Sequence, residues 1–83
     1  MIECNRTLEQ ARRDYAQGRL AGAALLRVPM SGHEWTVRLC GRRGDDGMLL
    51  DVRTLQPQVF ATLDAAVRAL EAVGFRCDQL KLG

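Results

Sequence analysis

Two runs of alternating apolar and polar residues flank a turn-forming segment in the middle of this sequence. In the first run, residues 34–40, every second residue from Trp35 to Leu39 is apolar, which is the period of a half-buried strand. Residues 41–47 consist of Gly, Arg and Asp, and their Asp-Gly step favours the positive backbone angles of a hairpin. The second run, residues 48–53, alternates again, with one row formed by Met48, Leu50 and Val52. The sequence therefore predicts two antiparallel strands joined by this turn.

A helix is predicted over residues 7–17 by its capping signal and its apolar spacing. Thr7 with Gln10 three residues later matches a reciprocal capping box, and Glu9 places negative charge at the positive end of the helix. Gly18 is suited to the left-handed conformation that ends a helix. The apolar positions form one narrow stripe, consisting of Leu8, Ala11 and Tyr15. We therefore expect this helix to lie at the edge of the core with much of its surface in water.

A second helix, capped by Thr62 and ending at Val73, has the stronger signal. Its apolar stripe is continuous and contains Leu63, Ala66, Val67 and Leu70. Gly74 is suited to close this helix, with Phe75 folding back onto Leu70.

The remaining extended segments complete the predicted fold. Residues 23–30 form a first strand, which Pro29 confines to a sheet edge or breaks at its far end. Residues 58–60 form a short extended piece, and residues 76–82 contain a final strand. The order α-β-β-β-α-β predicts a single small α+β domain over residues 1–83, with a mostly antiparallel sheet packed against one or two helices.

Length and charge limit what such a domain does. A chain of 83 residues buries only about 60–65% of the surface that its unfolded form exposes, so a homodimer would add stability. The net charge is +2, but residues 1–43 carry eight Arg against four acids, whereas residues 44–83 carry four basic residues against six acids. Arginine outnumbers lysine eleven to one, which fits a GC-rich genome as well as selection for guanidinium contacts to phosphate.

Cysteine usage and hydropathy point to the cytoplasm. Cys4, Cys40 and Cys77 are odd in number and form no C-x-x-C pair, which disfavours a disulfide framework and a zinc site. The start of the chain is polar, and no apolar run approaches the ~18 residues of a spanning helix. We expect a soluble cytoplasmic protein with no membrane contact.

No set of residues in the sequence is arranged for catalysis. His33 is the one histidine and lies in a Ser-Gly-His turn, and the Asp-Asp-Gly step lacks the further oxygen ligands of a calcium loop. The scattered cysteines match no metal-ligand spacing. We therefore expect no enzyme, no cofactor and no metal. A small hydrolase or redox enzyme that pairs Cys40 or Cys77 with His33 is the least favoured alternative.

Aromatic residues are too few for a platform on which single-stranded bases stack, since the chain has one Trp, one Tyr and two Phe. Trp35 shares its strand face with Val37 and Leu39, which favours a place in the core over an interface anchor. Cys40 and Cys77 are expected to be small buried hydrophobic residues.

Arginines on the predicted hairpin and on the first helix are the candidate binding residues. A strand pair tipped with arginines can contact a nucleic-acid backbone, and helix arginines would extend the patch if the fold brings them alongside. Asp45 and Asp46 lie in the same turn and could neutralise the two arginines at its tip. The candidates are Arg38, Arg42 and Arg43 on the hairpin, with Arg12, Arg13 and Arg19 on or after the helix.

Three segments together carry a resemblance to a known family. They are residues 7–15 with Gly18, residues 35–39, and residues 59–67 with Gly74 and Phe75. They resemble a family of short proteins from bacterial plasmids and integrative elements that is described as partition-associated, or ParC-like, and is unrelated to the topoisomerase subunit of that name. The resemblance covers most of the chain, and its main motif is F-x-T-L-D-A-A, starting at Phe60. It implies an accessory protein of plasmid maintenance or partition, and it transfers no catalytic residue.

Two functional hypotheses follow. The first is a non-enzymatic binding protein of a mobile element that contacts DNA, or a DNA–protein complex, through its arginines. The second is a small inhibitor or adaptor that binds a protein, such as an anti-CRISPR protein, in which the same arginines meet acidic surfaces or a free sheet edge pairs with a partner strand.

Overall fold

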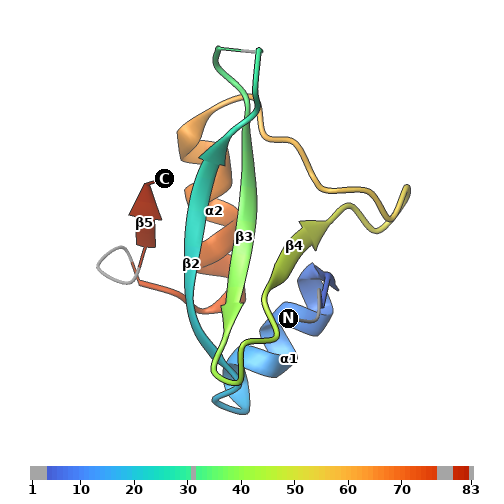
Figure 1. Cartoon of the computed structure of the whole chain (residues 1–83), viewed down its shortest axis with the longest axis vertical. Helices are drawn as coiled ribbons and strands as arrows, with labels where there is room; N and C mark the ends of the chain where they lie inside the picture. Colours follow the sequence, from blue (N-terminus) through green and yellow to red (C-terminus); the bar gives the residue numbers. More distant parts are fainter. Residues whose placement is uncertain (1–3, 31, 77–79, 83) are drawn as a thin grey trace.

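The computed structural model describes residues 4–30, 32–76 and 80–82, and it contains a five-stranded sheet with two helices (Figure 1). The elements in chain order are β1 (Arg6–Thr7), α1 (Leu8–Ala16), β2 (Leu20–Arg27), β3 (Trp35–Gly41), β4 (Gly47–Leu50), α2 (Leu63–Val73) and β5 (Leu80–Leu82). The predicted α+β class is confirmed. The two-residue strand β1 is an addition that the sequence did not predict.

The sheet has the strand order β1-β4-β3-β2-β5, and its centre is antiparallel. Strand β3 pairs antiparallel with both β2 and β4, so the predicted hairpin is confirmed, with Arg38 opposite Met48. Strands β1 and β5 pair in parallel with β4 and β2. Each parallel edge strand follows or precedes a helix, because parallel neighbours need a crossover connection.

Two strand boundaries differ from the sequence prediction. The first strand begins at Leu20 rather than residue 23 and has a register irregularity between Leu20 and Gly22. It ends at Arg27, because Pro29 cannot donate to the ladder and the chain turns at Met30, whose φ is 68°.

Strand β4 is shorter than the predicted run 48–53. It ends at Leu50, because the carboxylate of Asp51 accepts the Arg53 backbone N–H at 2.8 Å and starts a turn. The predicted extended piece 58–60 forms no strand of its own, but Phe60 forms a bridge with Trp35 and the Gln58 N–H donates to the Leu49 carbonyl at 2.9 Å. The predicted final strand is present as β5, and residues 77–79 of that prediction lie outside the described residues.

Helix α1 has the predicted caps. The Thr7 N–H donates to Gln10 Oε1 at 2.9 Å, and the Gln10 N–H donates to Thr7 Oγ1 at 3.5 Å, which is the reciprocal capping box. Gly18 has a φ of 74°, the left-handed conformation that ends the helix. Ala11 is buried, while Leu8 and Tyr15 are half-buried, so the apolar stripe is as narrow as predicted.

Helix α2 ends at Gly74, whose φ is 130°. The N–H groups of Gly74 and Phe75 both donate to the Leu70 carbonyl at 3.1 Å, so the chain folds back as predicted. The Phe75 ring then meets the Tyr15 ring of α1 edge-on, with centroids 4.7 Å apart. A Cβ at Gly74 would lie 2.7 Å from that tyrosine ring, so both the backbone angle and the helix contact require glycine here.

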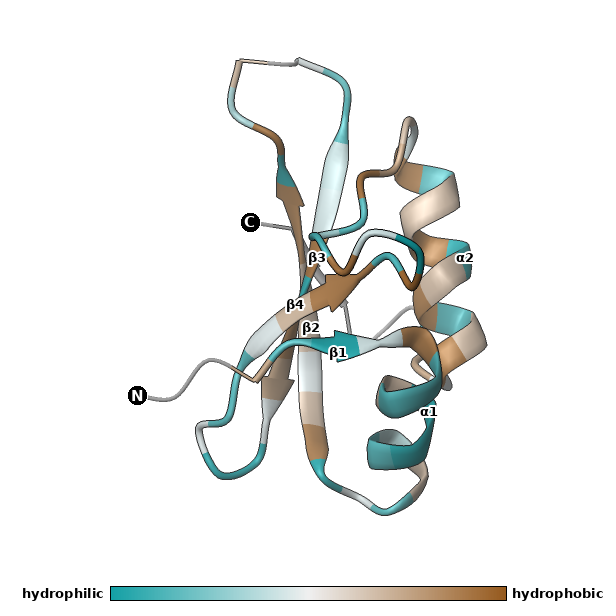
Figure 2. Cartoon of the chain, turned by 90° about the vertical axis from the view of Figure 1, so that its right-hand side faces the viewer, coloured by the Kyte–Doolittle hydropathy of each residue, from teal (hydrophilic) through white to brown (hydrophobic). Residues whose placement is uncertain are grey.

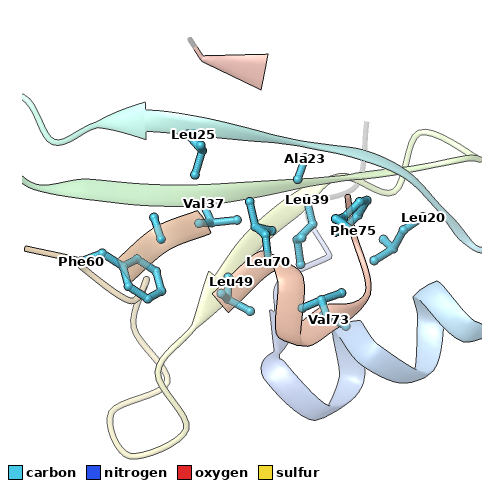
Figure 3. Close-up of a cluster of buried hydrophobic side chains, with 12 residues drawn as sticks. Leu20, Ala23, Leu25, Val37, Leu39, Leu49, Phe60, Leu70, Val73 and Phe75 are labelled. Atoms are coloured by element: carbon cyan, nitrogen blue, oxygen red, sulfur yellow. The ribbon is translucent and has the colours of Figure 1, made fainter. Parts of the chain in front are cut away.

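Both helices lie on one face of the sheet (Figure 2), and the hydrophobic core fills the space between them and the strands (Figure 3). Helix α2 buries Ala66, Leu70 and Val73, which follow the spacing of one helix face. The sheet contributes Leu20, Ala23, Leu25, Val37, Leu39 and Leu49. Trp35 packs half-buried against the edge of this core, and the Arg27 guanidinium lies 5.2 Å from its ring centroid.

The other sheet face carries no helix of the described chain (Figure 2). Because strand side chains alternate, the neighbours of the buried residues occupy this face, and most of them are half-buried. The half-buried ones include Ala24, Leu26, Thr36, Arg38, Cys40, Met48 and Leu50.

A substitution at Leu70 tests this assignment of the core. Replacing the fully buried Leu70 by Ala removes packing between α2 and the sheet, and we expect a decrease of about 3 kcal/mol in the free energy of unfolding. The same change at the exposed Leu55 should cost no more than about 0.5 kcal/mol. Urea denaturation followed by circular dichroism measures both, and equal decreases would contradict the assigned core.

Candidate functional site

A hollow of about 490 Å³, which we call the arginine hollow, lies at one end of the molecule between the end of α1 and the β3–β4 turn. Its lining consists of Gln17, Gly18, Arg19, Arg42, Arg43 and Asp45. This end is the lower end in Figure 2, where hydrophilic colour covers both the turn and α1. The structure therefore brings together three of the six arginines that the sequence singled out.

Backbone geometry places these arginines side by side. The left-handed Gly18 turns the chain out of α1 and into β2, whose first residue, Leu20, pairs with Gly41 at the end of β3. The Arg42 N–H donates to the Arg19 carbonyl at 2.9 Å, which joins the two turns directly. Arg19 and Arg42 lie on opposite ends of the β2–β3 segment in sequence, so only the ladder between these strands makes them neighbours.

The three arginine side chains are exposed, and within the described residues none of them forms an ion pair or a side-chain hydrogen bond. The carbonyl end of α1 is close by and carries a partial charge of about −0.5. Three guanidinium groups exceed this charge, so the arginine hollow stays positive and favours an anion.

Asp45 and Asp46, which the sequence left as possible partners of the arginines at the tip of the turn, are bonded to other groups. Asp46 Oδ1 accepts the Gly41 N–H at 3.0 Å and so stabilises the end of β3. Asp45 Oδ2 accepts from Arg6 Nη2 at 2.8 Å. Both carboxylates are used by the fold, which leaves Arg42 and Arg43 without an acidic partner among the described residues.

Arg6 is the residue that sequence reasoning missed. Its side chain is only 2% exposed, its Nε donates to Asp14 Oδ2 at 2.7 Å, and its Nη1 donates to the Cys4 carbonyl at 3.1 Å. Arg6 directly precedes the capping residue Thr7, where hydrophobic residues often pack against the first helical turns, but an arginine there gives no such signal in the sequence.

The other predicted arginines lie elsewhere. Arg12 and Arg13 are exposed on α1, where they line a separate, open hollow together with Glu9. Arg38 is half-buried on the sheet face opposite the helices, with its Nη1 4.0 Å from Met48 Sδ, and it does not line the arginine hollow.

The residues considered for catalysis are not brought together. His33 is exposed in the turn between β2 and β3, and Cys40 is half-buried at the far end of β3; Cys77 lies outside the described residues. Across residues 4–30, 32–76 and 80–82, no three His, Cys, Asp or Glu side chains cluster as a metal site requires. In the same residues, no helix combines the length and hydrophobicity needed to cross a membrane.

No protein-family model, curated protein or solved structure matches this chain. The resemblance to partition-associated proteins therefore stays a prediction.

Arg6 gives the stability prediction for this site. Replacing it by Met leaves Asp14 and Asp45 close together without their shared cation, and we expect the free energy of unfolding to fall by about 3 kcal/mol. The same change at the exposed Arg12 should cost about 0.5 kcal/mol or less. Thermal and urea unfolding at neutral pH compare the two variants, and an Arg6 variant as stable as the Arg12 variant would disprove the structural role.

Proposed function

We propose that this chain is a non-enzymatic accessory binding protein of a bacterial mobile element, of the plasmid maintenance or partition type, and that its arginine hollow contacts the phosphates of duplex DNA. One observation carries the proposal: Arg19, Arg42 and Arg43 line one hollow, and the acids of the same turn are bonded to other groups. The mobile-element context comes from the family resemblance alone.

The chemistry of the arginine hollow fits phosphate better than base. Guanidinium groups donate two parallel hydrogen bonds to phosphate oxygens, and such contacts supply most of sequence-independent DNA affinity. No aromatic residue of the described chain lines the hollow, so stacking on single-stranded bases has no support there. Arg12 and Arg13 on the exposed side of α1 offer further phosphate contacts.

Salt dependence tests this proposal. We expect wild-type protein to bind a labelled duplex in fluorescence anisotropy, with log K falling linearly with log salt. The double variant Arg42→Gln, Arg43→Gln should bind more weakly, and its slope should shrink by roughly 0.9 for each phosphate that these arginines no longer neutralise.

The matched control is Arg53→Gln, Arg68→Gln, which removes the same charge from exposed sites outside the arginine hollow. This control should keep the wild-type slope. Absence of binding at low salt, or equal weakening in both double variants, would refute a phosphate site in the hollow.

A second function, the protein-binding inhibitor or adaptor, is favoured by the segment between β4 and α2. Val52, Leu55 and Val59 are exposed there, with Leu55 62% exposed. The segment is held by hydrogen bonds: the Leu55 N–H donates to the Asp51 carbonyl at 2.7 Å, and the Asp51 N–H donates to the Gln56 carbonyl at 2.9 Å. Leu55 has a φ of 56°, an unfavourable conformation for leucine, so the fold accepts strain and still presents apolar side chains to solvent.

Leu55→Glu separates this second function from the first. After nuclease treatment of a host lysate, wild-type bait and the Arg42→Gln, Arg43→Gln bait should both retain the same host protein, and the Leu55→Glu bait should release it, because a charge would enter the apolar contact. The exposed position of Leu55 keeps the variant folded. The adaptor function would be contradicted if no host protein is retained, or if the Leu55→Glu bait retains the same protein as the wild-type bait.

A further inference from the structure

The arginine hollow contains one carboxylate, Asp45, two residues after Arg43. An acid so close to exposed arginines would ordinarily pair with one of them and reduce its attraction for an anion. Within the described residues no ion pair joins Asp45 to Arg42 or Arg43, although all three line the same hollow. Some other interaction therefore determines where this carboxylate lies.

That interaction is the ion pair with Arg6. The guanidinium of Arg6 lies between two carboxylates, with Nη2 2.8 Å from Asp45 Oδ2 and Nε 2.7 Å from Asp14 Oδ2. Its side chain is buried, whereas Arg42 and Arg43 are exposed to water. A buried cation is destabilised far more than an exposed one when its partner leaves, so Arg6 outcompetes the hollow arginines for Asp45.

Gly41 makes room for the carboxylate in this position. A Cβ at Gly41 would collide with the Asp45 carboxylate, so the side chain lies directly against the β3 backbone. Asp45 Oδ1 is buried there and has no hydrogen-bond partner in the described part of the chain. One carboxylate oxygen is therefore on Arg6 and the other is covered by the β3 backbone, while the Asp45 side chain as a whole is 38% exposed.

We propose that Arg6 is a positioning residue of the arginine hollow: it retains Asp45 against Gly41, so that Arg19, Arg42 and Arg43 keep their charge for a ligand phosphate. This inference rests on the proposed DNA function. Arg6 itself is buried and makes no contact with the ligand. The planar fork of arginine reaches both carboxylates at once, which the single ammonium of lysine cannot do with the same geometry.

A double-variant cycle of Arg6→Lys and Asp45→Asn, with duplex affinity as the readout, tests the inference. Arg6→Lys should weaken binding about fivefold, because a released Asp45 pairs with the hollow arginines. Adding Asp45→Asn to Arg6→Lys should restore wild-type affinity. Asp45→Asn alone should raise affinity less than it does in the Arg6→Lys background, because in wild-type protein the Asp45 carboxylate is bonded to Arg6 and not to the hollow arginines.

Asp14→Asn is the control for a purely structural effect. It removes the other ion pair of Arg6 and lowers the melting temperature, but Arg6 still retains Asp45, so DNA affinity should stay at the wild-type value. If Arg6→Lys does not fold, arginine side-chain NMR of the wild-type protein decides instead. On addition of duplex, the Nε signals of Arg42 and Arg43 should shift and that of Arg6 should not.

The outcomes separate the two proposals. A wild-type protein that does not bind duplex refutes the DNA function and this inference with it. If wild-type protein binds but Asp45→Asn changes affinity by the same factor in the wild-type and Arg6→Lys backgrounds, the positioning role is overturned and the DNA function is not. An Arg6 Nε signal that moves with those of Arg42 and Arg43 overturns it as well.

Discussion

The ion pairs of Arg6 connect parts of the chain that apolar packing leaves loosely joined. Helix α1 buries only Ala11 completely, so its hydrophobic contribution to the core is small. Arg6 compensates by bonding Asp14 on α1 and Asp45 in the β3–β4 turn from a strand of two residues. A buried cation is stabilised by the carboxylates that pair with it, so Arg6 ties these three segments to one another.

The molecule therefore has an apolar half and a polar half with different sources of stability. Where α2 covers the sheet, Leu39, Leu70 and Phe75 pack in a conventional core (Figure 3). Where α1 meets the β3–β4 turn, charged and backbone groups replace that packing, and the arginine hollow lies at this end (Figure 2). In our proposal, fold stability is linked to the charge of the hollow there, because Asp45 is bonded to Arg6 and not to the hollow arginines.

Signals that act over a few residues were readable from the sequence. The Thr7 and Gln10 capping box, the left-handed Gly18 and the fold-back after Gly74 are each determined by neighbours within one helical turn. The start of β2 was not readable, since alanine and glycine are poor strand formers, and the ladder with β3 decided its boundary at Leu20. The partner of Asp45 was not readable either, because Arg6 lies 39 residues away in the sequence.

The sequence by itself determined the class of fold, the antiparallel hairpin and the caps of both helices, because periodicity and turn chemistry act locally. It also singled out six arginines as candidate binding residues. Only the tertiary structure decided which of them share a site: the β2–β3 register places Arg19 beside Arg42 and leaves Arg38 on the opposite sheet face. It also decided that Arg6 is a buried partner rather than a surface charge. The physical reason is that the energy of an ion pair depends on the distance between the two charges in space. Residues far apart in the sequence can be as close in space as neighbours in the chain.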